Sequence, residues 1–165
     1  MILYTEKGAG LHVAITAAGH WLREDDGQWV CSDEAAVQAL IDGYTLEQAK
    51  AFRKAEVSAL ATKLRNKVIK GYSAGEMASW SIKLAEARTF AIDPLASCPL
   101  LTLEAQTRGV ALASLAQRVL DNATLFAGAE AMIAGVEGMH RDSIDALADF
   151  DGVAAYDFTG GWPAT

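Results

Sequence analysis

The first 32 residues contain short apolar runs separated by turn-forming residues, a pattern typical of short β-strands. Residues 11–16 form the clearest such run, and residues 20–22 and 28–31 flank the turn-forming pair Asp26-Gly27. We therefore predict a small antiparallel hairpin or three-stranded meander over residues 1–32, with residues 11–16 as one of its strands. A unit of this size is marginally stable alone and has to pack against another part of the protein.

From residue 33 onward, apolar positions recur every three or four residues, which predicts amphipathic helices. Asp33 is a suitable N-cap for a first helix that Gly43 can end. Thr45 and Gln48 form a capping-box pair at the start of a second helix, and neither glycine nor proline follows before residue 71. That helix is predicted to be about 25 residues long, or ~37 Å.

The apolar spacing in the second half of the chain predicts two more long helices. Ser73 and Glu76 give the first a start signal, and Asp93-Pro94 ends it. Residues 93–101 are expected to be an apolar connection because Pro99 cannot continue a helix. The second helix is predicted to begin at Thr102, with one apolar stripe made of Leu112, Leu115, Val119, Phe126, Ala129, Ile133 and Val136.

Two features of that last helix leave alternatives open. Asn122 falls on the apolar stripe, where it would either fix the register between paired helices or be satisfied by a neighbouring helix. Gly128, Gly135 and Gly138 weaken a helix, so they predict close backbone contact or a break.

The predicted fold class is therefore mainly α, with a small N-terminal hairpin or meander followed by long helices in a bundle or coiled-coil-like arrangement. We predict three parts: a β unit at 1–32, a helical domain at 33–150 and an irregular aromatic tail at 151–165.

The charge and composition of the chain indicate its cellular compartment and the classes of partner that it can bind. The net charge is −7, and half of the basic residues lie in the segment 50–70. We interpret that segment as the solvated face of a helix. The alternative is a nucleic-acid-binding face, which the acidic net charge of the chain disfavours. Two cysteines without CxxC spacing suit a reducing compartment. The sequence lacks a signal peptide and a run of ~18 apolar residues, so we expect a cytoplasmic protein without a membrane partner.

Candidate catalytic chemistry is sparse. The sequence has no nucleophile elbow, no HExxH, no phosphate-binding loop and no dinucleotide fingerprint. His12, His20 and Cys31 offer at most three ligands, fewer than a structural zinc site needs. His140 is interpreted as a surface residue. We therefore expect no enzyme activity, no metal and no cofactor.

The remaining signal points to protein–protein interaction. The helical stripes are wide and rich in alanine, so part of them is expected to pair with a second copy of the chain or with another protein. Trp80 and the tail aromatics Tyr156, Phe158 and Trp162 are the candidate partner-binding residues, because aromatic side chains are enriched at interface hot spots. The alternative for the tail aromatics is docking onto their own chain.

Residues 76–126 carry a resemblance to a known family. The segment resembles the helical C-terminal region of tailed-phage tail-fibre assembly proteins and related phage tail proteins. The matching positions are Glu76-Met77-Ala78-Ser79-Trp80, Glu86-Ala87-Arg88, Cys98-Pro99-Leu100-Leu101, Thr107-Arg108-Gly109-Val110, Leu115, Val119 and Ala123. Cys98 departs from the pattern, because the family has threonine there.

The resemblance implies a role in phage morphogenesis. A protein of this kind would act in the host cytoplasm as a chaperone that binds a tail-fibre protein during its assembly. The alternative is a structural component of the tail, baseplate or fibre that remains in the virion.

Overall fold

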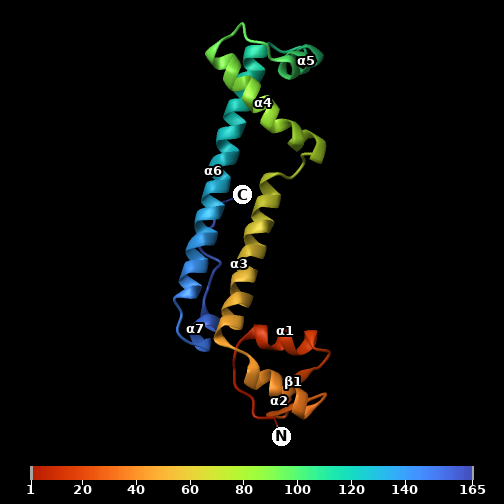
Figure 1. The fold of residues 1–165 in the computed structure, drawn as a ribbon, viewed down its shortest axis with the longest axis vertical. Coiled ribbons are helices and arrows are strands. Elements are labelled where there is room, and N and C mark those ends of the chain that lie inside the picture. The colour runs from red at the N-terminus through yellow and green to blue at the C-terminus, as the bar shows by residue number, and fades with distance from the viewer. Residues whose placement is uncertain (1, 165) are drawn as a thin grey trace. The chain divides into compact units, whose positions relative to one another are not determined.

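The computed structural model describes residues 2–164 and is mainly α-helical, with one small two-stranded antiparallel sheet near the N-terminus (Figure 1). The predicted fold class is therefore confirmed. The chain forms two compact units. Unit 1 comprises the residues up to Thr62 together with Ala134–Trp162, and unit 2 comprises Lys63–Ile133 and the residues from Pro163 on. The long helices α3 (Leu46–Val68) and α6 (Leu112–Asp145) each contribute residues to both units.

The hairpin of unit 1 forms where the sequence predicts it. Strands β1 (Leu22–Asp25) and β2 (Gln28–Cys31) pair antiparallel, with Asp25 opposite Gln28 at the turn. The two turn residues, Asp26 and Gly27, have φ of 48° and 76°. Positive φ at both central residues defines the type I′ turn, whose twist matches that of the paired strands.

The strand predicted at residues 11–16 is wrong, because this segment lies in helix α1 (Ala9–Ala17). Leu11 and Ile15 lie four residues apart and are fully buried, whereas Val13 between them is 52% exposed. A short run of alternating apolar residues therefore also satisfies helical spacing, and its period alone cannot separate the two structures.

The predicted caps of the next two helices are confirmed. In α2 (Glu34–Gly43), the carboxylate of Asp33 accepts a hydrogen bond from the Ala36 backbone N–H at 3.0 Å. At the start of α3, the Thr45 N–H donates to the Gln48 side chain at 2.7 Å, and the Gln48 N–H donates to the Thr45 hydroxyl at 3.3 Å. These bonds satisfy N–H groups that the helix itself leaves unpaired.

The core of unit 1 is built from large side chains. It joins the N-terminal segment, α1, α2, the start of α3 and the short helix α7 (Phe150–Ala155), which Asp149 caps. The first residues of the predicted irregular tail are therefore helical. The buried members of this core are Ile2, Leu11, Ile15, Val37, Ile41, Tyr44, Ala49 and Val153.

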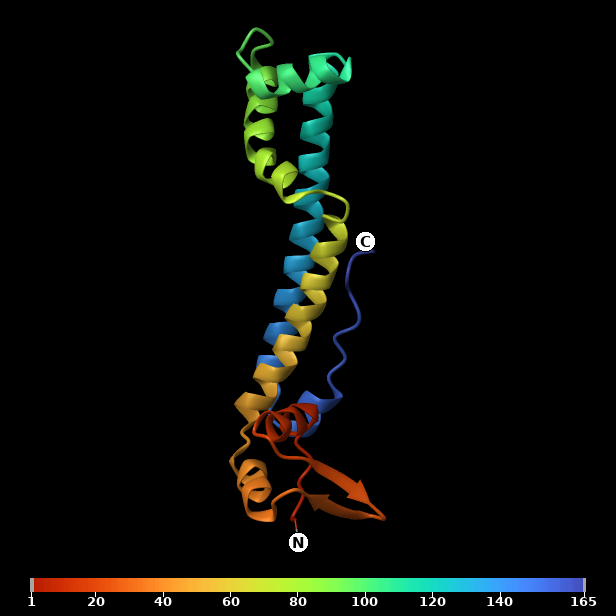
Figure 2. The ribbon, with the colours of Figure 1, turned by 90° about the vertical axis from the view of Figure 1, so that its right-hand side faces the viewer.

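Unit 2 is organised by α4 (Ala74–Ile92), α5 (Pro99–Arg108) and the first part of α6 (Figure 2). The predicted start signal of α4 is confirmed, since the Ser73 hydroxyl accepts the Glu76 N–H at 3.1 Å. The single helix predicted from Thr102 is wrong. Gly109 adopts a left-handed conformation with φ 65° and ends α5, and α6 begins three residues later.

The predicted connection at 93–101 is shorter than expected, because α5 already begins at Pro99. Proline suits the first position of a helix, where its missing N–H would have no partner in any case. The core of unit 2 consists mostly of small side chains: Ala87, Cys98, Leu101, Ala105, Leu115 and Ala116.

The expected consequences of Asn122 and the glycines of α6 are not seen within the chain. Asn122 is exposed, so no neighbouring helix of this chain satisfies it. A Cβ atom built on Gly128, Gly135 or Gly138 would meet nothing within 4 Å, and α6 runs unbroken past all three.

Among the described residues, α6 is the one helix long and apolar enough to cross a membrane by length and composition. Its most apolar window has a mean hydropathy of 1.2, and 6% of that window is buried. The sequence showed no unbroken apolar run there because Glu130 and Glu137 interrupt it.

Candidate protein interface at the α4–α5 corner

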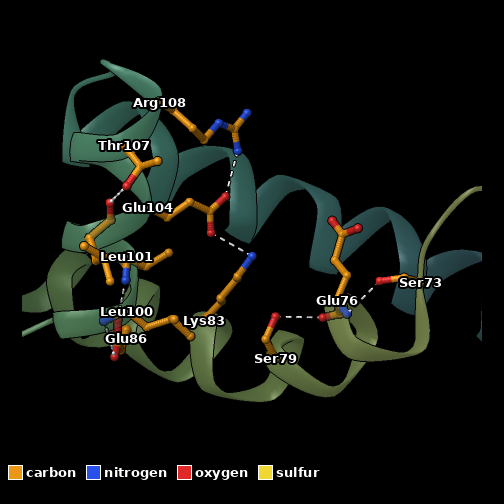
Figure 3. A network of polar contacts seen from close by, with 11 residues as sticks. Ser73, Glu76, Ser79, Lys83, Glu86, Leu100, Leu101, Glu104, Thr107 and Arg108 are labelled. Atoms are coloured by element: carbon orange, nitrogen blue, oxygen red, sulfur yellow. Dashed lines mark hydrogen bonds and ion pairs between the residues drawn. The ribbon is translucent and has the colours of Figure 1, made fainter.

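Helix α5 is capped by a side chain from a different helix. Cys98, its N-cap residue, offers no side-chain cap. Instead, the carboxylate of Glu86 on α4 accepts the backbone N–H of Leu100 at 3.2 Å and that of Leu101 at 2.8 Å (Figure 3). The Cys98 thiol in turn donates to the backbone carbonyl of Glu86 at 3.3 Å. A carboxylate at this position also interacts favourably with the positive end of the helix dipole.

A second polar contact lies about one turn later on α5 and one turn earlier on α4. Glu104 on α5 accepts from Lys83 Nζ and from Arg108 Nη1, each at 2.7 Å (Figure 3). The side chains of Lys83 and Glu104 are 17% and 23% exposed, so water screens this pair less than a surface pair. The hydrogen bond from Lys83, followed by that from Arg108, lowers the pKa of Glu104 against the opposing effect of its partial burial.

These two contacts fix which face of α5 points inward. Leu101 and Ala105 lie four residues apart and are buried against Ala87 of α4. Leu103 lies between them in sequence on the opposite face and is 64% exposed. The polar contacts on α4 therefore hold a large apolar side chain outward.

The connection between α4 and α5 also presents apolar side chains to solvent. Ile92, the last residue of α4, is 87% exposed, and Leu95 is 94% exposed. The connection is hydrogen-bonded to itself, because Asp93 accepts the Leu95 N–H at 2.9 Å on its side chain and the Ala96 N–H at 3.0 Å on its carbonyl. We refer to Ile92, Leu95 and Leu103 together as the α4–α5 corner.

Trp80 lies in unit 2 but not at this corner. Its ring makes edge-on contacts with Tyr72, at a centroid distance of 5.1 Å, and with Phe126 of α6, at 5.7 Å. Trp80 is half-buried, so it helps hold α4 on α6. A role for it in contacting a partner stays a prediction.

The three tail aromatics lie together in unit 1. The Tyr156 hydroxyl lies 2.8 Å from His140 Nδ1, and the Trp162 indole N–H donates to the Phe158 carbonyl at 2.7 Å. The Arg53 guanidinium lies 4.9 Å from the centre of the Phe158 ring. The structure thus brings Tyr156, Phe158 and Trp162 onto their own chain, which is the self-docking alternative. A partner contact through their half-exposed parts stays a prediction.

The interpretation of His140 as a surface residue is wrong. It is 5% exposed, and its Nε2 lies 3.0 Å from the Gly160 carbonyl in addition to the Nδ1 contact with Tyr156. The tail residues that contact it, Tyr156, Gly160 and Trp162, follow 16 to 22 positions later in the chain. No local pattern around His140 could show this burial.

The segment 50–70 is also not simply a solvated face. Lys50 is 7% exposed, and its Nζ donates to the Asp145 carbonyl at 3.0 Å. Lys54 pairs with the Asp145 carboxylate at 2.6 Å, and Arg53 donates to the Tyr156 carbonyl at 2.6 Å. These cations hold α3 to the C-terminal part of unit 1.

The predicted metal candidates do not converge. His12 lies 3.0 Å from the Tyr4 hydroxyl, and His20 lies 3.1 Å from the Ser32 hydroxyl. Across residues 2–164, no three His, Cys, Asp or Glu side chains are placed to hold a metal ion.

The sequence did not single out the α4–α5 corner. Two signals could have indicated it. Leu103 stands out of phase with the helical pair Leu101 and Ala105, and Leu95 follows Pro94 in a turn where an apolar side chain has little to pack against. The long-range cap by Glu86 has no local sequence signal.

Comparisons with protein-family models, with curated proteins and with solved structures give no match to this chain.

Proposed function

We propose that the chain is a phage tail-fibre assembly chaperone that grips a tail-fibre protein through the α4–α5 corner. The observation that carries the proposal is the exposure of Ile92, Leu95 and Leu103, at 87%, 94% and 64%, on a frame fixed by hydrogen bonds and ion pairs.

Large aliphatic side chains exposed in this way favour a binding role. At about 25 cal/mol per Å² of apolar surface, covering one such side chain with a partner contributes on the order of 1.5–3 kcal/mol. The contacts of Glu86 with Leu100 and Leu101 and of Glu104 with Lys83, which we call the clamp, hold α5 on α4. The clamp favours affinity, because a surface already held in its binding conformation loses less entropy on association.

The identity of the partner comes from the resemblance. The segment 76–126 that resembles tail-fibre assembly proteins includes most of α4, the corner, α5 and the first part of α6. The clamp residue Glu86 and the positions Cys98-Pro99-Leu100-Leu101 belong both to the resemblance and to the observed α4–α5 junction. A tail-fibre protein is therefore the partner that we propose.

The proposal is tested by co-expressing the chain with a phage tail-fibre protein. The wild-type chain is expected to raise the yield of soluble, trimeric fibre. The double variant Leu95→Asp, Leu103→Asp should lose most of that gain, because two carboxylates at the interface would lose their hydration without gaining a partner.

Leu3→Asp is the matched control. It places the same charge on an exposed leucine of unit 1, where the side chain is 74% exposed. If Leu3→Asp and the corner variant lower the fibre yield equally, or if the wild-type chain has no effect on it, the proposal fails. The alternative role as a virion component shares this surface, and mass spectrometry of purified particles separates the two, since a chaperone is absent from them.

A further inference from the structure

The outward face of α6 carries a regular pattern of large side chains that stay at least half exposed. The tail reaches this face at one end, where a Cβ atom on Gly161 would lie 3.8 Å from Met139 Cε. Leu125, Met132 and Met139 follow one another at seven-residue spacing and are 72%, 56% and 51% exposed. Gly128 and Gly135 fall between them, three residues after Leu125 and three after Met132. Large and minimal side chains thus alternate at the two positions of a heptad that face a paired helix.

This face belongs to a single helix and is open to solvent. A Cβ atom at Gly128 or Gly135 would meet nothing within 4 Å, so no part of the chain occupies the space above either glycine. The same spacing continues to Arg118 at one end and to Asp142 at the other, and both are exposed. From residue 118 to residue 142 the face is ~36 Å long at 1.5 Å per residue.

We propose that a second copy of this chain packs antiparallel along this face of α6. In an antiparallel pair, one register sets Leu125 of each copy opposite Gly135 of the other and Met132 opposite Gly128. Each large side chain then enters the space left by a glycine, which lets the two helices approach closely.

The charges at the ends of the face favour the same register. This register sets Arg118 of one copy opposite Asp142 of the other at both ends of the contact. Parallel pairing would instead oppose Arg118 with Arg118, Asp142 with Asp142 and glycine with glycine, which combines like-charge repulsion with empty space. The face is therefore complementary to itself in the antiparallel direction, and this favours a second copy over an unrelated partner.

One position of the register is less favourable. Asp121 falls opposite Met139, near the ends of the contact. There the Gln117 side chain already donates to the Asp121 carboxylate at 2.8 Å, and the flexible methionine can turn aside.

Sedimentation equilibrium of the purified full chain tests the proposal. The wild-type chain is expected to be a dimer at micromolar concentration. Gly128→Leu fills the space that Met132 of the other copy needs, and should weaken the dimer at least about tenfold, a loss of about 1.4 kcal/mol. The fold of the single chain should survive, because leucine favours a helix more than glycine does and the added side chain meets open space.

Ala127→Leu is the matched control, since it adds similar bulk one residue away on an exposed part of α6 outside the face. It should dimerise like the wild type. A wild-type chain that stays monomeric up to about 100 µM, or equal dimerisation by the two variants, would overturn the proposal.

A charge swap tests the register. Arg118→Asp and Asp142→Arg should each weaken the dimer, and the double variant should regain most of the lost affinity. No recovery in the double variant would rule out the antiparallel register. The assay contains no fibre, so its outcome is independent of the chaperone proposal.

Discussion

The cores of the two units differ in the size of the side chains that fill them. In unit 1, Leu11, Ile15 and Ile41 are at most 1% exposed. In unit 2, four of the six buried core residues are alanine or cysteine, and Ile92, Leu95 and Leu103 face solvent.

Polar contacts follow the same division. Unit 1 places Lys50 and Arg53 where backbone carbonyls of its C-terminal part accept their hydrogen bonds. Unit 2 uses Glu86 and Glu104 to hold α5 on α4. Unit 1 therefore gains its stability from large side chains closed into a core, whereas unit 2 holds α5 on α4 with polar contacts and leaves Ile92, Leu95 and Leu103 exposed.

The largest expected effect on stability is the difference between truncating a buried side chain in unit 1 and an exposed one in unit 2. Ile41→Ala in unit 1 should lower the free energy of unfolding by about 2–5 kcal/mol, because it leaves a cavity in a closed core. Leu103→Ala in unit 2 should change it by less than about 0.5 kcal/mol. Urea denaturation of both variants measures the contrast, and comparable losses would contradict the description of Leu103 as a solvent-facing residue.

Removing the clamp should have the next largest effect. Glu86→Ala leaves the N–H groups of Leu100 and Leu101 without their acceptor, and is expected to cost about 1–3 kcal/mol. Glu76→Ala, on the exposed first turn of α4, serves as the control and should cost less than about 1 kcal/mol. An equal loss in the two variants would mean that Glu86 does not fix α5.

Docking of the tail in unit 1 should contribute less to the free energy of unfolding than the Glu86 contacts do. Tyr156→Phe removes the hydroxyl that lies 2.8 Å from His140 Nδ1, and should lower the free energy of unfolding by about 0.5–1.5 kcal/mol. Tyr72→Phe makes the same change on a ring that is 46% exposed and should be nearly neutral. Thermal denaturation of the two variants provides the comparison. An unchanged stability of Tyr156→Phe would show that this hydrogen bond does not stabilise the docked tail.

The smallest expected effect is a dependence on pH through Glu104. Its folded-state pKa lies below the unfolded value, so its ion pairs stabilise the protein fully above about pH 4.3. That stabilisation is lost as the pH falls through the folded-state pKa. The Tm values of the wild type and of Glu104→Gln should therefore converge between about pH 6 and pH 3. A constant difference between them would show that the Glu104 ion pairs contribute nothing.

Features with local signals could be predicted from the sequence. Asp33, Thr45 with Gln48, and Ser73 cap the helices that they were expected to begin. Asp26-Gly27 forms the predicted hairpin turn. In each case the interacting groups lie within three residues of one another, so the chemistry can be read from the local sequence.

Features that depend on distant contacts could not be predicted. His140 is buried by the tail, and Glu86 caps a helix that starts 13 residues later. Residues 11–16 fit both a strand and a helix until the packing of Leu11 and Ile15 decides between them. The exposure of Leu103 depends on which face of α5 the contacts of Glu86 and Glu104 hold inward.

The proposed function requires binding through the α4–α5 corner of unit 2. Hydrogen–deuterium exchange of the chain, measured with and without the co-expressed tail-fibre protein, tests this claim most directly. We expect the fibre to slow exchange of the backbone amides between residues 92 and 108, with little change in α1, α2 and the hairpin of unit 1. Slowed exchange confined to unit 1, or no change at the corner in a stable complex, would contradict the account.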